Sequence, residues 1–346
     1  MKHIIGFVLS VAATAAACAV AAPPVKVIFD TDMYTDFDDA GALACLHALA
    51  DAGECEILAT LACTRDCMSV AMCEIINTFY GRPDLPVGCA KEIGVTGASP
   101  SHLKRYEATV TAYGAWVRHR NSDAAPDANV IYRKVLAAQP DGSVVICSVG
   151  FLTNLRRLLE TAPDAISPLD GRALVAKKVA RWVAMACKHP NGKEYNAMQD
   201  SESSRIALER WPTPVIFTDF EYGRDCFAGR ALAERGAKGN PVADVFAGNL
   251  PSRDDIRQAP ERYRASAYGM GGRAAWDETA VLIAVRGTSP CFNVARGAYR
   301  MVGTDGEDEW TPDEAHGPHL RVTERLPKDE VARLIDELML RPPRRR

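Results

Sequence analysis

Beyond its first twenty-odd residues, the sequence has no run of about 18 apolar residues, the length that a helix needs to cross a membrane. It also has no excess of positive charge, because 41 Lys and Arg residues face 44 Asp and Glu residues for a net charge of −3. The first absence excludes a membrane span in the mature chain, and the second removes the basic field that attracts nucleic acid. The hydrophobic share of 47% is that of a globular protein with a buried core.

A zinc-binding cysteine pattern is missing as well. None of the 11 cysteines forms a CxxC pair, and the nearest spacing, Cys63 to Cys67, has no matching second half. We therefore expect the ten cysteines that follow Cys18 to be structural, as disulfides or as free thiols.

The N-terminus differs from the rest of the chain. A positively charged start precedes an apolar stretch over residues 4–20 and a run of small residues before Pro23. This pattern predicts a signal peptide over residues 1–22 and an exported protein, periplasmic or extracellular. A retained membrane anchor and a lipid anchor at Cys18 are the alternatives. Residues 23–346 are expected to form a single domain.

Short runs rich in β-branched residues alternate with helical patterns along the mature chain. The predicted strands are residues 25–29, 56–61, 143–148, 179–185 and 214–218, and the predicted helices include residues 40–50, 69–80 and 154–160. Such alternation is typical of an α/β fold with a doubly wound, mostly parallel sheet flanked by helices. We expect a ligand site at the C-terminal ends of the strands. Residues 239–268 are polar and weakly patterned, which predicts an inserted loop or helical lid.

Carboxylates are crowded directly after the first predicted strand. Five of them lie within residues 30–39: Asp30, Asp32, Asp36, Asp38 and Asp39. Like charges a few ångströms apart repel by about 4 kcal/mol per pair at an effective dielectric near 20, so they must be solvated, protonated or bound to a cation. Oxygen ligands suit Ca²⁺ or Mg²⁺. A solvated turn that caps the next helix is the alternative.

Two known kinds of acidic site fit this cluster less well. An EF-hand requires a different spacing of its oxygen ligands and a central glycine. A phosphohydrolase of the haloacid dehalogenase type also places Asp-x-Asp after its first strand, with Asp30 as nucleophile and Asp32 as acid and base. That hypothesis leaves Asp36, Asp38 and Asp39 without a role.

The segment from Asp30 to Leu43 resembles the N-terminal signature of the inosine-uridine preferring nucleoside hydrolase family. Three further pieces follow in the family's order. They are Gly150-Phe151-Leu152-Thr153-Asn154, Glu194-Tyr195-Asn196 and Trp276-Asp277-Glu278. The resemblance extends from about residue 25 to the C-terminus and implies hydrolysis of a nucleoside to ribose and free base.

The resemblance also implies a Ca²⁺ ion at the bottom of a pocket. By position, its ligands are the side chains of Asp32, Asp39 and Asp277 and the main-chain carbonyl of Val149. Asp32 is then also the catalytic general base that activates a water molecule. In this comparison Asp30 supports the metal-binding loop from behind.

Further residues are implied as contacts to the nucleoside. Asp38, Glu194 and Asn196 are expected to bind ribose hydroxyls, and Asn191 is a looser candidate in the same loop. Asp66 stands where family members usually carry asparagine. A carboxylate accepts hydrogen bonds where an amide can also donate, so the contact to substrate must differ. Glu221 follows another predicted strand and so points toward the same crevice.

The largest departure from the family pattern is Trp276. Many members carry histidine before the last metal-binding aspartate, where it assists departure of the base. An indole cannot donate a mobile proton, so Trp276 either stacks on the base or only packs the wall. His189 is a candidate for the missing acid.

Two functions of different class follow from this sequence. The first is calcium-dependent hydrolysis of ribonucleosides, and the second is binding of a nucleoside or other ribosyl ligand by a catalytically weak family member. The expected partner is a small molecule rather than nucleic acid, and the resemblance suggests a homodimer or homotetramer.

Overall fold

The computed structural model describes residues 23–65, 68–96, 100–260, 271–289 and 291–344. The predicted signal peptide, Cys18 and Asp66 lie outside these residues. Within them, no helix is long and apolar enough to cross a membrane. The nine described cysteines are all buried and free, so the alternative of free thiols holds for them.

The strands and helices alternate along most of the chain. The strands are β1 (Val25–Thr31), β2 (Cys55–Ala62), β3 (Val87–Cys89), β4 (Val144–Ser148), β5 (Val179–Ala184), β6 (Asn191–Gly192), β7 (Val215–Phe217), β8 (Phe227–Ala228), β9 (Arg273–Ala274), β10 (Phe292–Val302), β11 (Glu307–Pro312) and β12 (His319–Glu324). The α-helices are α1 (Asp38–Asp51), α2 (Ser69–Phe79), α3 (Pro100–Ala112), α4 (Ala128–Ala138), α5 (Thr153–Leu159), α6 (Gly171–Lys178), α7 (Tyr195–Gln199), α8 (Ser201–Arg210), α9 (Phe220–Arg224), α10 (Arg230–Arg235), α11 (Pro241–Asn249), α12 (Arg253–Gln258), α13 (Trp276–Arg286) and α14 (Lys328–Met339). Two short 3₁₀ helices, η1 (Gly114–Trp116) and η2 (Ser122–Ala124), follow α3.

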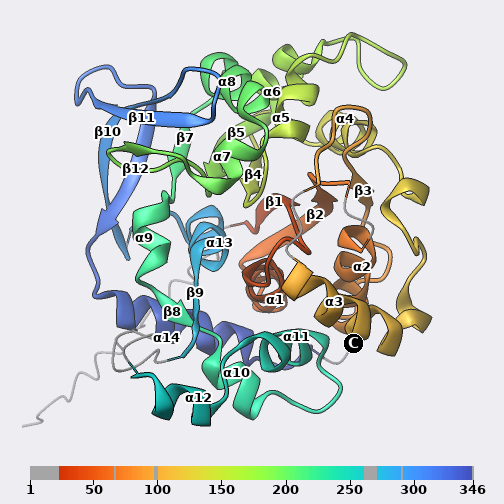
Figure 1. Ribbon diagram of the computed structural model, residues 1–346. Coiled ribbons are helices and arrows are strands. Elements are labelled where there is room, and N and C mark those ends of the chain that lie inside the picture. The colour runs from red at the N-terminus through yellow and green to blue at the C-terminus, as the bar shows by residue number, and fades with distance from the viewer. Residues whose placement is uncertain (1–22, 66–67, 97–99, 261–270, 290, 345–346) are drawn as a thin grey trace, which may run out of the picture.

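Ten of the described strands form one sheet in the order β3-β2-β1-β4-β5-β7-β12-β10-β11-β6. The pairs from β3 to β12 are all parallel, whereas β10, β11 and β6 continue the sheet in antiparallel pairs. Helices cover both faces (Figure 1). This arrangement confirms the predicted α/β fold with a mostly parallel sheet.

The central strands are buried because the sheet has an apolar core on each face. Phe29 of β1 packs into one core with α1, α13 and α14, and Ile28 packs into the other with residues of α4 and α5. Trp182 of β5 is fully buried in the second core. Adjacent residues of one strand therefore point into opposite layers, as strand geometry requires.

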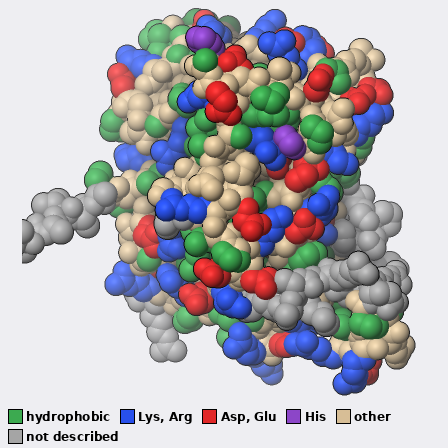
Figure 2. All heavy atoms as spheres, turned by 90° about the vertical axis from the view of Figure 1, so that its left-hand side faces the viewer, with side chains coloured by type: hydrophobic (Ala, Val, Ile, Leu, Met, Phe, Trp, Pro, Cys, Tyr) green, Lys and Arg blue, Asp and Glu red, His purple; other side chains and the backbone are tan. Residues whose placement is uncertain are grey.

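The antiparallel end of the sheet is the main feature that the sequence analysis missed. Strands β10 and β11 run with only a short turn between them, and β11 pairs with the two-residue strand β6. The burial of β11 alternates, with Asp308 and Trp310 buried and Glu309 between them exposed. Figure 2 shows the face of the molecule on which β10, β11 and β12 lie in Figure 1. Lys and Arg side chains are interspersed with Asp and Glu side chains on that face.

The weakly patterned stretch at residues 239–268 is helical where the structure describes it. Helix α11 begins with Pro241 after an Asn240 cap, and α12 begins with a capping box in which Ser252 and Asp255 bond each other's backbone N–H. Of the two predicted alternatives, an inserted loop or a helical lid, the helical one agrees with these two helices in secondary structure. The rest of the stretch, residues 261–268, lies outside the described residues.

Candidate active site

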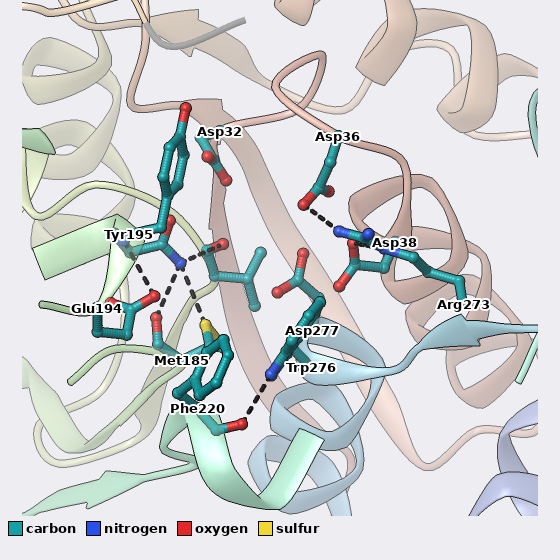
Figure 3. A pocket seen from close by; sticks show the side chains of 12 residues that line it. Asp32, Asp36, Asp38, Met185, Glu194, Tyr195, Phe220, Arg273, Trp276 and Asp277 are labelled. Carbon is teal, nitrogen blue, oxygen red and sulfur yellow. Dashed lines mark hydrogen bonds and ion pairs between the residues drawn. The ribbon is translucent and has the colours of Figure 1, made fainter. Parts of the chain in front are cut away.

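A pocket opens at the C-terminal ends of the parallel strands. Its cavity volume is about 150 Å³. The lining combines carboxylates, one guanidinium and aromatic rings: Asp32, Asp36, Asp38, Val149, Met185, Glu194, Tyr195, Asn196, Phe220, Arg273, Trp276 and Asp277. Figure 3 shows these side chains facing one another from several elements far apart in the sequence.

The acidic loop between β1 and α1 supplies one wall. Asp32 follows the last residue of β1, and Asp38 and Asp39 form the first turn of α1, where the helix dipole favours negative charge. The Asp32 carboxylate accepts a 2.5 Å hydrogen bond from the Thr35 hydroxyl, and the hydroxyl of Thr31 donates to Asp39. Short polar contacts within the loop therefore fix where these carboxylates lie.

Burial and mutual repulsion act together on these acids. The pKa values of Asp32, Asp39 and Asp277 are raised well above the usual range, first by burial and then by the negative charge of neighbouring aspartates. Asp39 Oδ2 is buried and has no hydrogen-bond partner among the described residues. A buried carboxylate oxygen without a partner is costly, so Asp39 Oδ2 requires a proton or a cation.

The chemistry of the donors fits a hard divalent cation. Asp32, Asp277 and Val149 line the pocket, and Asp39 acts electrostatically on Asp277 from behind the pocket wall. Carboxylate and carbonyl oxygens are the ligands that Ca²⁺ takes in proteins. Among the residues that the structure describes, however, no three His, Cys, Asp or Glu side chains form a ready-made metal cluster.

Asp30 lies behind the pocket rather than in it. Its side chain is fully buried, and its Oδ2 accepts hydrogen bonds from the Tyr132 hydroxyl at 2.8 Å and from Asn154 Nδ2 at 3.0 Å. Burial raises the pKa of Asp30 to about 7. A phosphotransferase nucleophile must reach its substrate, so this placement argues against the phosphohydrolase alternative and agrees with a supporting role for Asp30.

The opposite end of the pocket is formed by the start of α7. Glu194 caps this helix, accepting hydrogen bonds from the backbone N–H groups of Asn196 and Ala197 at 3.0 and 2.9 Å. Asn196 Nδ2 in turn donates to the carbonyls of Val149 and Met185 at 3.2 and 3.1 Å. Burial raises the pKa of Glu194 to about 7. The sequence-predicted pair Glu194 and Asn196 is thus held rigidly at this end.

A buried carboxylate that the sequence analysis did not select anchors the loop before α7. Asp308 Oδ1 on β11 accepts a 2.7 Å hydrogen bond from the backbone N–H of Lys188, and the backbone N–H of Glu194 also bonds this carboxylate. Burial raises the pKa of Asp308 to about 7. Because β6 in the same loop pairs with β11, the antiparallel end of the sheet positions the Glu194 wall.

Asp308→Ala is expected to raise KM about tenfold while kcat changes less than threefold. Leaving the two backbone N–H groups without their acceptor costs about 1–3 kcal/mol, and roughly 1.4 kcal/mol corresponds to a tenfold loss of affinity. Steady-state kinetics measure the effect. Asp308→Asn keeps an acceptor oxygen and is expected to restore KM to within threefold. An unchanged KM in Asp308→Ala contradicts the positioning role.

Trp276 is fixed in the wall of the pocket. Its indole N–H donates to the carbonyl of Phe220 at 2.9 Å, and the two rings stack with centroids 5.4 Å apart. The only donor of the indole is therefore engaged, so Trp276 does not supply a hydrogen bond to a departing base.

Two sequence-predicted contacts, Asn191 and Glu221, do not join this group. Asn191 is exposed on β6 and Glu221 accepts a 2.8 Å hydrogen bond from the backbone N–H of His189, and neither side chain lines the pocket. Asp66 lies outside the described residues. His189 does not line the pocket either, and burial together with Arg321 lowers its pKa.

Several lining residues escaped the sequence analysis, and Arg273 is the most consequential. It lies on the two-residue strand β9, four positions before Asp277, and it forms ion pairs with Asp36 and Asp38. Its Nε donates to Asp38 at 2.9 Å. Its position close to the Trp276-Asp277 element was the only feature of the sequence that could have pointed to Arg273. The neighbouring residues do not indicate that its partners are Asp36 and Asp38.

The pocket lies at the C-terminal ends of parallel strands, the place where open α/β sheets bind small ligands. The family model described as inosine-uridine preferring nucleoside hydrolase matches residues 27–332. The chain belongs to this family, and it is accordingly a nucleoside N-ribosyl hydrolase by class. A search of curated proteins by sequence finds no match.

Solved structures share the fold at low sequence identity. The inosine-uridine preferring nucleoside hydrolase from Bacillus anthracis is 15% identical, with a TM-score of 0.64, covering 91% of this chain and 99% of that one. The purine-preferring ribonucleoside hydrolase from Gardnerella vaginalis is 17% identical, with a TM-score of 0.64 and coverages of 91% and 99%. The type III effector XopQ, complexed with adenosine diphosphate ribose, is 16% identical, with a TM-score of 0.65 and coverages of 92% and 93%.

Proposed function

We propose that this protein hydrolyses the N-glycosidic bond of ribonucleosides in a calcium-dependent reaction, releasing ribose and free base. The observation that supports this most is the meeting of buried, mutually repelling carboxylates from the β1–α1 loop and from α13 at one pocket. Such a site gains stability from a divalent cation and from the positive charge that develops on a sugar as its glycosidic bond breaks.

In this proposal the ion is held by Asp32, Asp39, Asp277 and the carbonyl of Val149. When bound, Ca²⁺ orients ribose hydroxyls and lowers the pKa of a neighbouring water molecule. Asp32 accepts the proton of the attacking water, since it borders the pocket and its Oδ2 is oriented by Thr35.

The remaining contacts hold the sugar. Asp38 accepts a hydrogen bond from a ribose hydroxyl on one side, and Glu194 and Asn196 bind hydroxyls at the other end of the pocket. Orientation of a substrate between two such fixed walls removes part of the entropic barrier to reaction. The pattern of residues 1–22 supports export of the protein, and residues 23–346 are proposed as its single domain.

The direct test is release of ribose from inosine, uridine, cytidine and adenosine by the purified mature protein, with calcium or with a chelator. We expect release with calcium and at least a hundredfold less after chelation. Binding of a nucleoside without release supports the alternative of a ribosyl-binding protein. Phosphate release from phosphoesters contradicts both.

Calcium affinity is expected to rise with pH. The pKa values of Asp32, Asp39 and Asp277 are raised in the metal-free protein, so protons must leave before the carboxylates can bind a cation. Calorimetry in buffers of different ionisation enthalpy should detect proton release on calcium binding and a weaker affinity at pH 5.5 than at pH 8. Affinity independent of pH argues against these ligands.

A further inference from the structure

The pocket contains a permanent cation beside the acidic loop. The Arg273 guanidinium carbon lies 5.0 Å from the ring centroids of both Phe37 and Trp276, and ion pairs to Asp36 and Asp38 fix it from the side. Figure 3 shows Arg273 at the Asp38 end of the pocket, across from Glu194 and Tyr195. A guanidinium stacked and paired in this way is ordered before any ligand arrives.

Not all of its hydrogen-bond capacity is used. Nε donates to Asp38 and Nη2 donates to Asp36, whereas Nη1 has no acceptor among the described residues. A guanidinium carries five N–H donors and no acceptor, and it does not lose its proton in proteins. Arg273 can therefore bind an electron-rich group but cannot act as a general acid.

The position of Asp38 relates Arg273 to the bond that breaks. The proposed function has Asp38 accept a hydrogen bond from a ribose hydroxyl. If that hydroxyl is the one on C2′, next to the anomeric carbon, then the anomeric carbon and its base lie at the Asp38 end of the pocket. The charged group bonded to Asp38 is Arg273. The inference made here rests on that part of the proposed function.

We propose that Arg273 stabilises the departing base as an anion, in place of a proton donor. The C–N bond breaks with its electron pair on the base nitrogen, while water forms the new C–O bond and passes a proton to Asp32. The base leaves paired with Arg273 and takes its proton from solvent. Because Arg273 only donates, base edges that present ring nitrogen or carbonyl acceptors fit it best.

This role explains how the pocket can function with Trp276 in place of an acid. The indole N–H is bonded to Phe220, and the described lining residues include no histidine. Removing one preorganised donor from developing negative charge typically lowers turnover by about 10²–10³-fold. The demand for such a donor vanishes when the leaving group is already stable as an anion.

The test compares inosine with 4-nitrophenyl β-D-ribofuranoside, whose leaving group needs no stabilisation. Arg273→Gln is expected to lower kcat/KM for inosine about 10²–10³-fold but for the nitrophenyl riboside less than tenfold. Arg224→Gln is the matched control, because Arg224 is an exposed arginine near Phe220 that pairs with Asp225, and both substrates should be unaffected. Equal losses on both substrates overturn the inference.

A measurement on the wild-type protein tests the same inference even if the Arg273→Gln variant does not fold. Without a general acid, kcat for inosine should not fall as pH rises from 7 to 9. A tenfold decline per pH unit in that range shows that a proton donor acts instead, and it overturns the role of Arg273. Cleavage of neither substrate by the wild-type protein contradicts the proposed function itself, whereas cleavage of the nitrophenyl riboside alone contradicts only the inference.

Discussion

Asp32→Asn is expected to lower kcat for ribonucleoside hydrolysis by at least about a thousandfold. Loss of a general base alone typically costs about 10²–10⁴-fold, and this substitution also replaces a proposed calcium ligand with a neutral amide. The fold should persist, because the asparagine oxygen can still accept the Thr35 hydroxyl that now bonds Asp32. Ribose release under saturating calcium and nucleoside measures the effect.

The control for this substitution is Asp141→Asn. Asp141 is an exposed carboxylate that pairs with Lys178 far from the pocket lining, so its loss should leave kcat within twofold. If Asp32→Asn keeps more than a tenth of the wild-type kcat, another group activates the water and the assignment of Asp32 is wrong.

Asp39→Asn is expected to change stability in opposite directions with and without calcium. In chelator, it removes one of the repelling buried charges and keeps an acceptor for the Thr31 hydroxyl, so Tm should rise by about 1–2 °C for about 1 kcal/mol in a domain of this size. With calcium at about 100 times its Kd, the wild-type protein gains about 2.7 kcal/mol that the variant should not gain. Thermal denaturation at pH 8 measures both.

The crossing of these two effects separates a metal ligand from an ordinary structural acid. If Asp39 only capped α1, the Asn variant would be less stable than the wild-type protein both in chelator and in calcium, because the favourable interaction with the helix dipole is removed. A calcium shift of equal size in the wild-type and Asp39→Asn proteins would remove Asp39 from the ligand set. Asp329→Asn in the first turn of α14 provides the matched comparison for a plain helix-dipole effect.

The parallel half of the sheet was predictable because its strands carry their own signal. Strands β1, β2, β4, β5 and β7 are apolar runs buried on both faces, and each ends within a few residues of its predicted limit. The antiparallel half was missed because its pattern is mixed. In β11 the buried positions include Asp308, and a buried acid within an acidic strand looks like exposed surface in sequence.

Strand geometry predicted residues of the candidate site only where a family motif directly follows a predicted strand. Asp32 and Val149 directly follow β1 and β4, and strand-end geometry gathers them at one edge of the sheet. Glu194 lies further beyond β5, and its place depends also on β6 and Asp308. Arg273 was not predictable in this way, since its ion-pair partners lie more than two hundred residues earlier in the chain. Asn191 was overestimated because its neighbour in sequence, Glu194, faces the pocket while β6 turns outward.

Calorimetric titration of the chelator-treated protein with calcium tests the central claim most directly, since the proposed reaction depends on Asp32, Asp39 and Asp277 sharing one divalent ion. We predict one binding site per chain, and a loss of detectable binding in Asp277→Asn while the circular dichroism spectrum is retained. A wild-type protein that takes up no calcium, or an Asp277→Asn variant that binds it with unchanged affinity, would contradict the account.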